Sequence, residues 1–303
     1  MTTQLAVTGV AILLQVLGNG LDSAVVTPVA CALLLVFGLP HGTLDLELLR
    51  RRDAGGPGQG TLLVAYGICA AAMFAVWLLA PLLALALFLA AAIEHFAGDW
   101  RDMGSRFIAY GTAVALVATP ALLHRAELSS IFAALTGTTS ASYLADLLLI
   151  VMPVAGGIAV AGIGLLWQRG HRQRAIGLAA ALLGEALLPP VVGFALFFCL
   201  VHSPYQLRES LRQLQRPTQD AWLRIILPLT FVAVTLAALI GASALRVSLD
   251  AAALRASFVT LSVLTLPHML VPYAARRYRT VIGKHRNRGP SPLRRHRDAR
   301  ASS

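Results

Sequence analysis

Four of the eight histidines in the sequence close or interrupt long apolar runs, and these four are the best candidates for chemistry. His41, His95 and His202 each close a run, and His268 lies inside the last one. Ionisable side chains at membrane depth are costly and are retained mostly for function. Imidazole binds iron, copper and zinc, and the three isolated cysteines argue against a structural zinc or an iron–sulfur cluster. One such histidine alone is more typical of a helix end at the lipid head groups, but four together predict a metal site.

A polar amide accompanies the third of these histidines. The apolar run that ends at His202 begins with Pro189 and Pro190, which the first turn of a helix tolerates. Gln206 follows His202 by four residues, so the imidazole and the amide share a face if the helix continues. Pro204 lies between them and can distort that turn. The spacing favours a common target for both side chains.

Two carboxylates stand at the same spacing from other histidines. Asp45 follows His41 by four residues, and Asp99 follows His95 by four. A carboxylate at that distance can accept the second ring N–H of a metal-binding histidine and fix the ring. A glycine lies between the members of each pair and can break the helix, so an ordinary interfacial carboxylate is the alternative for each acid.

An all-helical membrane protein is needed to bring these side chains together. The chain of 303 residues is 57% hydrophobic and 13% charged, and its mean hydropathy is +0.72. A soluble domain carries about 25% charged residues. Apolar runs of membrane-spanning length recur along the sequence. We therefore predict an all-α fold, a polytopic transmembrane helical bundle of residues 1–275, followed by a basic, disordered cytoplasmic tail, 276–303, that contacts anionic lipid.

We predict ten apolar segments and prefer a count of ten spans, with both termini in the cytoplasm. Pairs of segments separated only by Pro81, or by Pro189 and Pro190, can instead be single kinked helices, which leaves eight or nine spans open. The N-terminus lacks the basic region of a signal peptide, which indicates that the first segment is a retained span. The predicted segments are 4–18, 23–39, 61–80, 81–96, 106–123, 142–166, 175–188, 190–206, 222–245 and 256–273.

The basic residues give an internal check on this topology. The net charge of +11 comes from a few loops and the tail, as the positive-inside rule expects. Ten spans place every basic residue except Arg125, Arg246 and Arg255 on the cytoplasmic side. This distribution indicates membrane orientation and argues against nucleic acid as a partner. Because all four histidines belong to even-numbered segments, we expect them in the cytoplasmic half of the membrane, where a bundle core can hold a metal.

Four pieces of the sequence together resemble the Brp/Blh family of membrane β-carotene 15,15′-dioxygenases. They occur in the order and spacing of that family over nearly the whole chain. The first and third pieces, GLPHG…D and PPxxxFxxxFxxxHS, are fairly specific. The pieces are Gly38-Leu39-Pro40-His41-Gly42-Thr43-Leu44-Asp45, His95-Phe96 with an acid shortly after it, Pro189 to Ser203, and Leu266-Pro267-His268-Met269.

The resemblance implies a non-haem Fe(II) enzyme, with Fe²⁺ as cofactor, that uses O₂ to cleave β-carotene centrally into two molecules of retinal. It implies that His41, His95 and His202 hold the iron and are the catalytic residues. The usual fourth ligand of the family is the second histidine of an HSxxH pair, and here Gln206 occupies that position. Three alternatives follow. Gln206 is a weak ligand or leaves a position open for O₂, His268 completes the site, or the iron has been lost.

An apolar polyene fits a site among transmembrane helices, because such a molecule can enter it from the bilayer. Phe194, Phe197 and Phe198 lie on the helix that carries His202 and can line a polyene tunnel, although ordinary packing explains each of them equally well. The expected partners are a carotenoid, O₂ and membrane lipid. We expect the inner membrane of a bacterial or archaeal cell, and the sequence does not predict an oligomeric state.

Two other functions stay open on the sequence. One is a non-catalytic carotenoid-binding relative that has lost the fourth histidine ligand, for which Gln206 is the main argument. The other is a transporter or proton relay in which the histidines and Glu185 carry protons. A transporter would need polar residues across the full depth of the membrane, and the grouping of the histidines toward one side argues against it.

Overall fold

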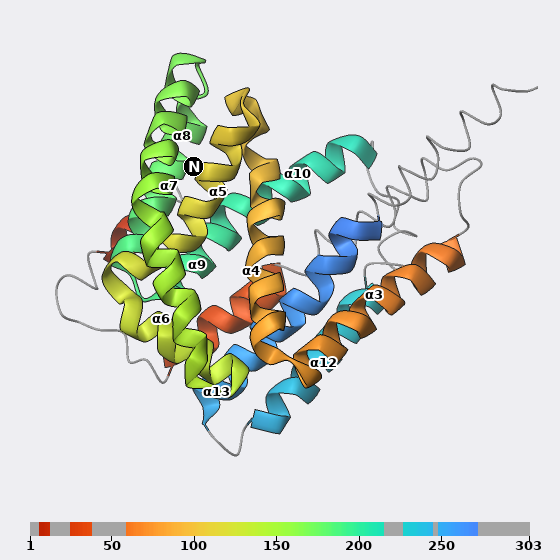
Figure 1. Ribbon diagram of the computed structural model, residues 1–303. Helices are drawn as coiled ribbons and strands as arrows, with labels where there is room; N and C mark the ends of the chain where they lie inside the picture. The colour runs from red at the N-terminus through yellow and green to blue at the C-terminus, as the bar shows by residue number, and fades with distance from the viewer. Residues whose placement is uncertain (1–5, 13–24, 38–58, 215–226, 245–247, 272–303) are drawn as a thin grey trace, which may run out of the picture.

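The computed structural model describes residues 6–12, 25–37, 59–214, 227–244 and 248–271. Within these residues all regular structure is helical, which confirms the predicted all-α class for this part of the chain. Figure 1 shows the described helices gathered into a bundle. His41, Asp45 and the basic tail, 276–303, lie outside the described residues.

The helices follow the apolar segments of the sequence. Helix Val25–Phe37 is apolar, and residues 260–271 are helical as well. Two short stretches, η1 (Gly98–Met103) and η2 (Thr139–Ala141), are 3₁₀ turns, and η3 (Phe198–His202) and η5 (Arg255–Val259) are π-helical. The labelled helices are α3 (Gln59–Leu79), α4 (Pro81–Ala97), α5 (Arg106–Ala118), α6 (Pro120–Thr136), α7 (Ser142–Gln168), α8 (Arg172–Leu187), α9 (Pro190–Phe197), α10 (Ser203–Leu214), α12 (Leu227–Ala244) and α13 (Leu249–Leu254).

Among the described residues, five helices are long and apolar enough to cross a membrane. The pair α5 and α6, bent by 51°, brings the number to six if it forms one span. Large apolar side chains such as Leu79 (85% exposed) and Phe231 (73% exposed) cover the outside, as expected for a surface in contact with lipid. The count of ten spans and the cytoplasmic termini stay predictions. The five helices are Gly60–Leu79, Pro81–Met103, Thr139–Gln168, Pro190–Arg212 and Leu249–Val271.

Prolines start two of the helices that position the candidate site. Helix α4 begins at Pro81, directly after Ala80, and α9 begins at Pro190 after an extended Leu188. In both cases the proline stands in the first turn, where the missing N–H breaks no hydrogen bond. The chain therefore forms separate helices at these points, as Figure 1 shows for α3 and α4.

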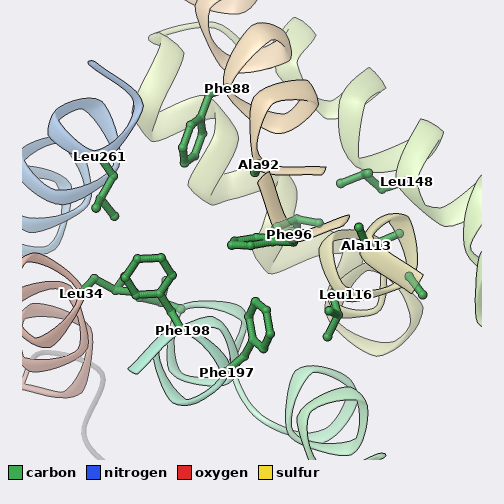
Figure 2. Close-up of a cluster of buried hydrophobic side chains, with 14 of the residues drawn as sticks. Leu34, Phe88, Ala92, Phe96, Ala113, Leu116, Leu148, Phe197, Phe198 and Leu261 are labelled. Atoms are coloured by element: carbon green, nitrogen blue, oxygen red, sulfur yellow. The ribbon is translucent and has the colours of Figure 1, made fainter. Parts of the chain in front are cut away.

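The helices that carry the predicted site meet in an apolar core. In Figure 2, Phe96 of α4 lies between Phe88 of the same helix and the two rings of Phe197 and Phe198. The ring centroids of Phe96 and Phe197 are 5.0 Å apart and the rings meet edge to face, which is a favourable aromatic geometry. Leu34 of helix Val25–Phe37 belongs to the same cluster and is fully buried.

Candidate metal centre

Three of the four predicted histidines lie together, and each comes from a different part of the chain. His95 stands near the end of α4, His202 is the last residue of η3, and His268 belongs to residues 260–271. The Nε2 atoms of His95 and His202 are 3.0 Å apart, and the ring centroids of His95 and His268 are 5.1 Å apart. The structure thus brings imidazoles from three segments to one place. His41 lies outside the described residues, so its membership of the cluster stays a prediction.

The carboxylate of Asp99 binds the other side of the His202 ring. Its Oδ2 atom lies 2.7 Å from His202 Nδ1, and its Oδ1 atom accepts a hydrogen bond of 2.6 Å from Nε2 of Gln206. His202 is 0% exposed and Asp99 is 3% exposed. A carboxylate beside Nδ1 keeps the ring proton on that nitrogen, which leaves the lone pair on Nε2, the atom that faces His95.

The partner of Asp99 differs from the one that the sequence spacing predicts. That spacing pairs Asp99 with His95, whereas among the hydrogen bonds of the described residues Asp99 is bonded to His202 and Gln206. The reason is local geometry. Helix α4 ends at Ala97 and the chain tightens into the 3₁₀ turn η1, which directs the carboxylate differently from an uninterrupted α-helix. Asp45 lies outside the described residues, and its role stays a prediction.

Arg174 of α8 binds the turn η1, which carries Asp99. Its guanidinium donates a hydrogen bond to the backbone carbonyl of Asp99 and forms an ion pair with Asp102. The same group lies over the ring of Trp100, 5.4 Å from the centroid, and over the ring of Tyr205, 4.8 Å from the centroid. One side chain therefore connects η1, α8 and α10 beside the histidines.

One turn of π-helix places His202. The backbone N–H of Ser203 bonds to the carbonyl of Phe198, five residues back, instead of four. Pro204 follows and has no N–H to donate, so the wider turn accommodates a residue that would break a regular helix. The distortion expected at Pro204 is therefore present. The side chains of His202 and Gln206 still share a target, and that target is the carboxylate of Asp99.

The donor atoms of this cluster fit part of a metal site. Two nitrogen atoms that bind one metal ion with bonds of about 2.1 Å and an angle of about 90° at the metal lie about 3.0 Å apart. This is the separation of the Nε2 atoms of His95 and His202. Within the described residues, no group of three or more His, Cys, Asp or Glu side chains is arranged so that it could hold a metal ion. A complete site would take a further ligand, for which the sequence offers His41, His268 or Gln206.

The helix that precedes His41 in the sequence ends beside this cluster. Ser203 Oγ donates a hydrogen bond of 2.7 Å to the carbonyl of Phe37, the last residue of helix Val25–Phe37. On the same helix, the carbonyl of Leu33 lies 3.6 Å from Sγ of Cys199. These two contacts hold helix Val25–Phe37 against η3, which carries His202, and against the first residue of α10.

An apolar cavity of about 70 Å³ lies in the same bundle, lined by residues of α4, α5, α6, α8, α9 and η5. Phe194 lines it together with Phe88 and Phe258. The ring of Phe194 is 5.8 Å from that of Phe258 and 6.3 Å from that of Phe96. The ring of Phe96 is in turn 4.9 Å from the imidazole of His202. Aromatic rings therefore connect the cavity with the candidate metal ligands.

The other two phenylalanines of the predicted tunnel surround His202. Phe197 and Phe198 are buried, with ring centroids 6.3 Å and 5.1 Å from that imidazole. Sequence reasoning missed Arg174 and Phe258. Arg174 lies among other basic residues, so the positive-inside rule already accounted for it. Phe258 stands in an apolar run, where no motif or spacing distinguishes it from ordinary packing.

Comparisons with known proteins identify a family. The sequence model of the beta-carotene 15,15'-dioxygenase family matches residues 32–274. A protein named beta-carotene 15,15'-dioxygenase, from the uncultured marine bacterium 66A03, is 29% identical to this chain over 260 residues. The alignment covers 80% of this chain and 91% of that relative. No solved structure matches the chain. In agreement with the resemblance of the four histidine-containing pieces, the chain belongs to the beta-carotene 15,15'-dioxygenase family.

Proposed function

We propose that this protein is a membrane-embedded, Fe²⁺-dependent oxygenase that cleaves β-carotene or a related polyene with O₂. Cleavage at the central double bond gives two molecules of retinal. Family membership over most of the chain supports the reaction. The observation that carries the proposal is the 3.0 Å approach of Nε2 of His95 to Nε2 of His202, because converging imidazoles are ligands of non-haem iron. The protein would span the inner membrane of a bacterial or archaeal cell.

His95, His202 and His41 would hold the iron. The support for His41 comes from the helix that precedes it. The carbonyl of Phe37 accepts a hydrogen bond from Ser203, the residue that follows His202. His41 comes four positions after Phe37 in the sequence. Four residues reach at most about 14 Å, so the chain is short enough to keep His41 near the cluster.

Bound Fe²⁺ would supply the activation of O₂ at coordination positions that the protein leaves open. The residues of the chain perform the other tasks. Asp99 holds the proton of His202 on Nδ1, so that Nε2 remains a lone-pair donor. The rings of Phe96, Phe197 and Phe198 enclose His202 and keep water away from a reacting double bond.

The polyene would reach this site from the bilayer. An apolar substrate dissolves among the lipid chains and can pass between helices, and the cavity lined by Phe88, Phe194 and Phe258 is one part of its path. At about 70 Å³ that cavity is much smaller than a carotenoid, so side chains along it have to move when the substrate enters. The entry of substrate is therefore coupled to motion of the side chains around Phe194.

The fourth coordination position is where this chain departs from its family pattern. Gln206 directs its amide nitrogen to Asp99, which favours a role in holding that carboxylate over a role as ligand. The ring of His268 lies 5.1 Å from that of His95, close enough to make it a candidate for the fourth ligand. We therefore propose that Gln206 positions Asp99 and that the fourth position is filled by His268 or is open to O₂.

Retinal formation in a β-carotene-producing bacterial host tests the proposal. Extracts of cells that express the wild type, His202→Ala or His171→Ala are compared by chromatography. His171 is an exposed histidine before α8 and serves as the matched control. We expect retinal from the wild type and from His171→Ala, and none from His202→Ala.

A negative result would favour one of the other two functions. If folded wild-type protein forms no retinal, the metal and pigment content of the purified protein separates them. Bound carotenoid without iron would indicate a non-catalytic carotenoid-binding relative. Neither carotenoid nor iron would favour a transporter or proton relay, which proton flux in vesicles then examines.

A further inference from the structure

Glu185 of α8 is a carboxyl group that the candidate metal centre does not use. It is 1% exposed, and neither of its carboxyl oxygens has a hydrogen-bond partner among the residues that the structure describes. Acids on other helices of the bundle have partners, since Asp146 of α7 pairs with Arg125 and Glu94 of α4 accepts a hydrogen bond from Tyr110. A carboxyl group that is buried among apolar side chains without a hydrogen-bond partner costs folding free energy, so its presence calls for a function.

Glu185 forms part of the wall of the apolar cavity beside Phe194. Every other residue that lines this cavity is apolar, including Leu85 and Val191. Gly193 of α9 allows α9 to lie close to α8 at this point, because a Cβ atom there would lie 3.0 Å from Cα of Glu185 and from the carbonyl oxygen of Gly184, and 3.2 Å from Oε2 of Glu185. The cavity therefore offers an apolar surface with a single carboxyl group at one point.

This combination defines the kind of molecule that the cavity would bind. The ligand has to be mostly apolar to fill the walls, and it has to carry an oxygen that can pair with a carboxylic acid. A hydroxyl or keto oxygen meets this requirement. A metal cation does not, because a lone carboxyl group among apolar side chains provides too few oxygen ligands.

The position of the cavity relative to the histidines corresponds to one half of a carotenoid. Val191 lines the cavity together with Glu185, and His202 lies 11 positions after Val191 in the sequence. At the helical rise of 1.5 Å per residue the two are separated by roughly 16 Å. That distance is on the order of half the length of an extended carotenoid. With its central double bond beside His202, such a molecule would place an end ring near Glu185.

We propose that Glu185 is a specificity residue that binds an oxygen substituent on the end ring of the substrate, so that ring-oxygenated carotenoids are preferred to β-carotene. This inference rests on the proposed function. The protonated carboxyl group of Glu185 donates a hydrogen bond to a keto oxygen or accepts one from a hydroxyl group. The substrate thereby supplies the partner that the described residues of the protein do not.

Competition between two polyenes tests this proposal. Purified wild type, Glu185→Leu and Glu185→Gln receive β-carotene mixed with its ring-hydroxylated derivative, and both aldehyde products are quantified. We expect the wild type to favour the hydroxylated polyene. Glu185→Leu should lower the ratio of the two kcat/KM values by about tenfold, the effect of one lost hydrogen bond, whereas Glu185→Gln keeps most of the preference. An unchanged ratio in Glu185→Leu would overturn the proposal.

A binding measurement separates this proposal from the oxygenase itself. His202→Ala protein, with and without Glu185→Leu, is purified from hosts that make either polyene, and the bound carotenoid is extracted. If Glu185→Leu lowers the ratio of bound hydroxylated polyene to bound β-carotene, the specificity role is supported. This holds even if the wild type forms no aldehyde, because that failure counts against the oxygenase function alone. Phe88→Leu, an apolar change in the same wall, should affect both polyenes alike. If the ratio of the two bound polyenes is the same with and without Glu185→Leu, the specificity role is contradicted.

Discussion

The Nδ1 atom of His202 lies 2.7 Å from Oδ2 of Asp99, and both side chains are buried. A carboxylate in this position fixes the orientation and the tautomer of a metal-binding imidazole. We expect Asp99→Asn to lower iron affinity about 10- to 100-fold and to slow retinal formation with it. Iron titration of purified, metal-depleted protein measures the affinity.

Asp146→Asn is the matched control for this change. Asp146 is also a carboxylate on a helix of membrane-spanning length, but it is partly exposed and pairs with Arg125 at 2.5 Å. The control should bind iron as the wild type does. Wild-type iron affinity in Asp99→Asn would mean that the Asp99 carboxylate does not support a metal ligand.

Gln206 donates a hydrogen bond of 2.6 Å to the second oxygen of Asp99. Gln206→Leu removes this donor from a buried carboxylate, which costs about 1–3 kcal/mol. We therefore expect a lower Tm in detergent and roughly tenfold slower retinal formation. Gln206→His keeps an N–H group and adds an imidazole, so it should preserve or raise activity. A large loss in Gln206→His would show that the amide has a role that imidazole does not fill.

The histidine cluster could be predicted from the sequence, whereas the network around it could not. Histidines in the same half of successive apolar segments lie at a similar depth, so a helical bundle brings them together, as found for His95, His202 and His268. The partner of Asp99 depends instead on where α4 gives way to η1, and that turn is held by Arg174 from another helix. Spacing within one segment carries no information about such a contact.

The helix boundaries, too, could be predicted from the sequence only in part. Pro81 and Pro190 predict helix starts through their fixed φ and missing N–H, and the structure has helices starting at both. The predicted segment 106–123 is wrong at its end, because Pro120 divides it into α5 and the start of α6, with a bend of 51°. Phe258 joins the wall of the cavity from η5, far along the chain from Phe194, so only the tertiary fold reveals it.

Ser203 Oγ donates a hydrogen bond of 2.7 Å to the carbonyl of Phe37, which links the helix before His41 to His202. Ser203→Ala removes this link while leaving Asp99 in place. Because the proposed third ligand follows Phe37, we expect a several-fold loss of iron per protein, measured by metal analysis after purification.

Ser130→Ala controls for the loss of a serine hydroxyl as such. The Ser130 hydroxyl is exposed and bonds at 3.1 Å to the carbonyl of Ala126 in its own helix, so its removal should leave the iron content unchanged. Full iron occupancy in Ser203→Ala would show that the placement of His41 does not depend on the hydrogen bond to Phe37.

Arg174 joins η1 to α8 through the carbonyl of Asp99 and the carboxylate of Asp102. Arg174→Ala removes both bonds together with the stacking on Trp100 and Tyr205. We expect a lower Tm and about tenfold weaker iron affinity, because the turn that positions Asp99 loses its anchor. Thermal unfolding in detergent and iron titration measure the two effects.

Lysine in place of Arg174 separates charge from geometry. An ammonium group carries the same charge but cannot form a planar fork or stack on two aromatic rings, so Arg174→Lys should recover little of either property. Arg172→Ala removes a neighbouring guanidinium that lies 5.5 Å from the ring centroid of Trp167, away from Asp99, and should change neither Tm nor iron affinity appreciably. If Arg174→Lys matched the wild type, a positive charge alone would hold η1, and the stacking on Trp100 and Tyr205 would be incidental to the position of Asp99.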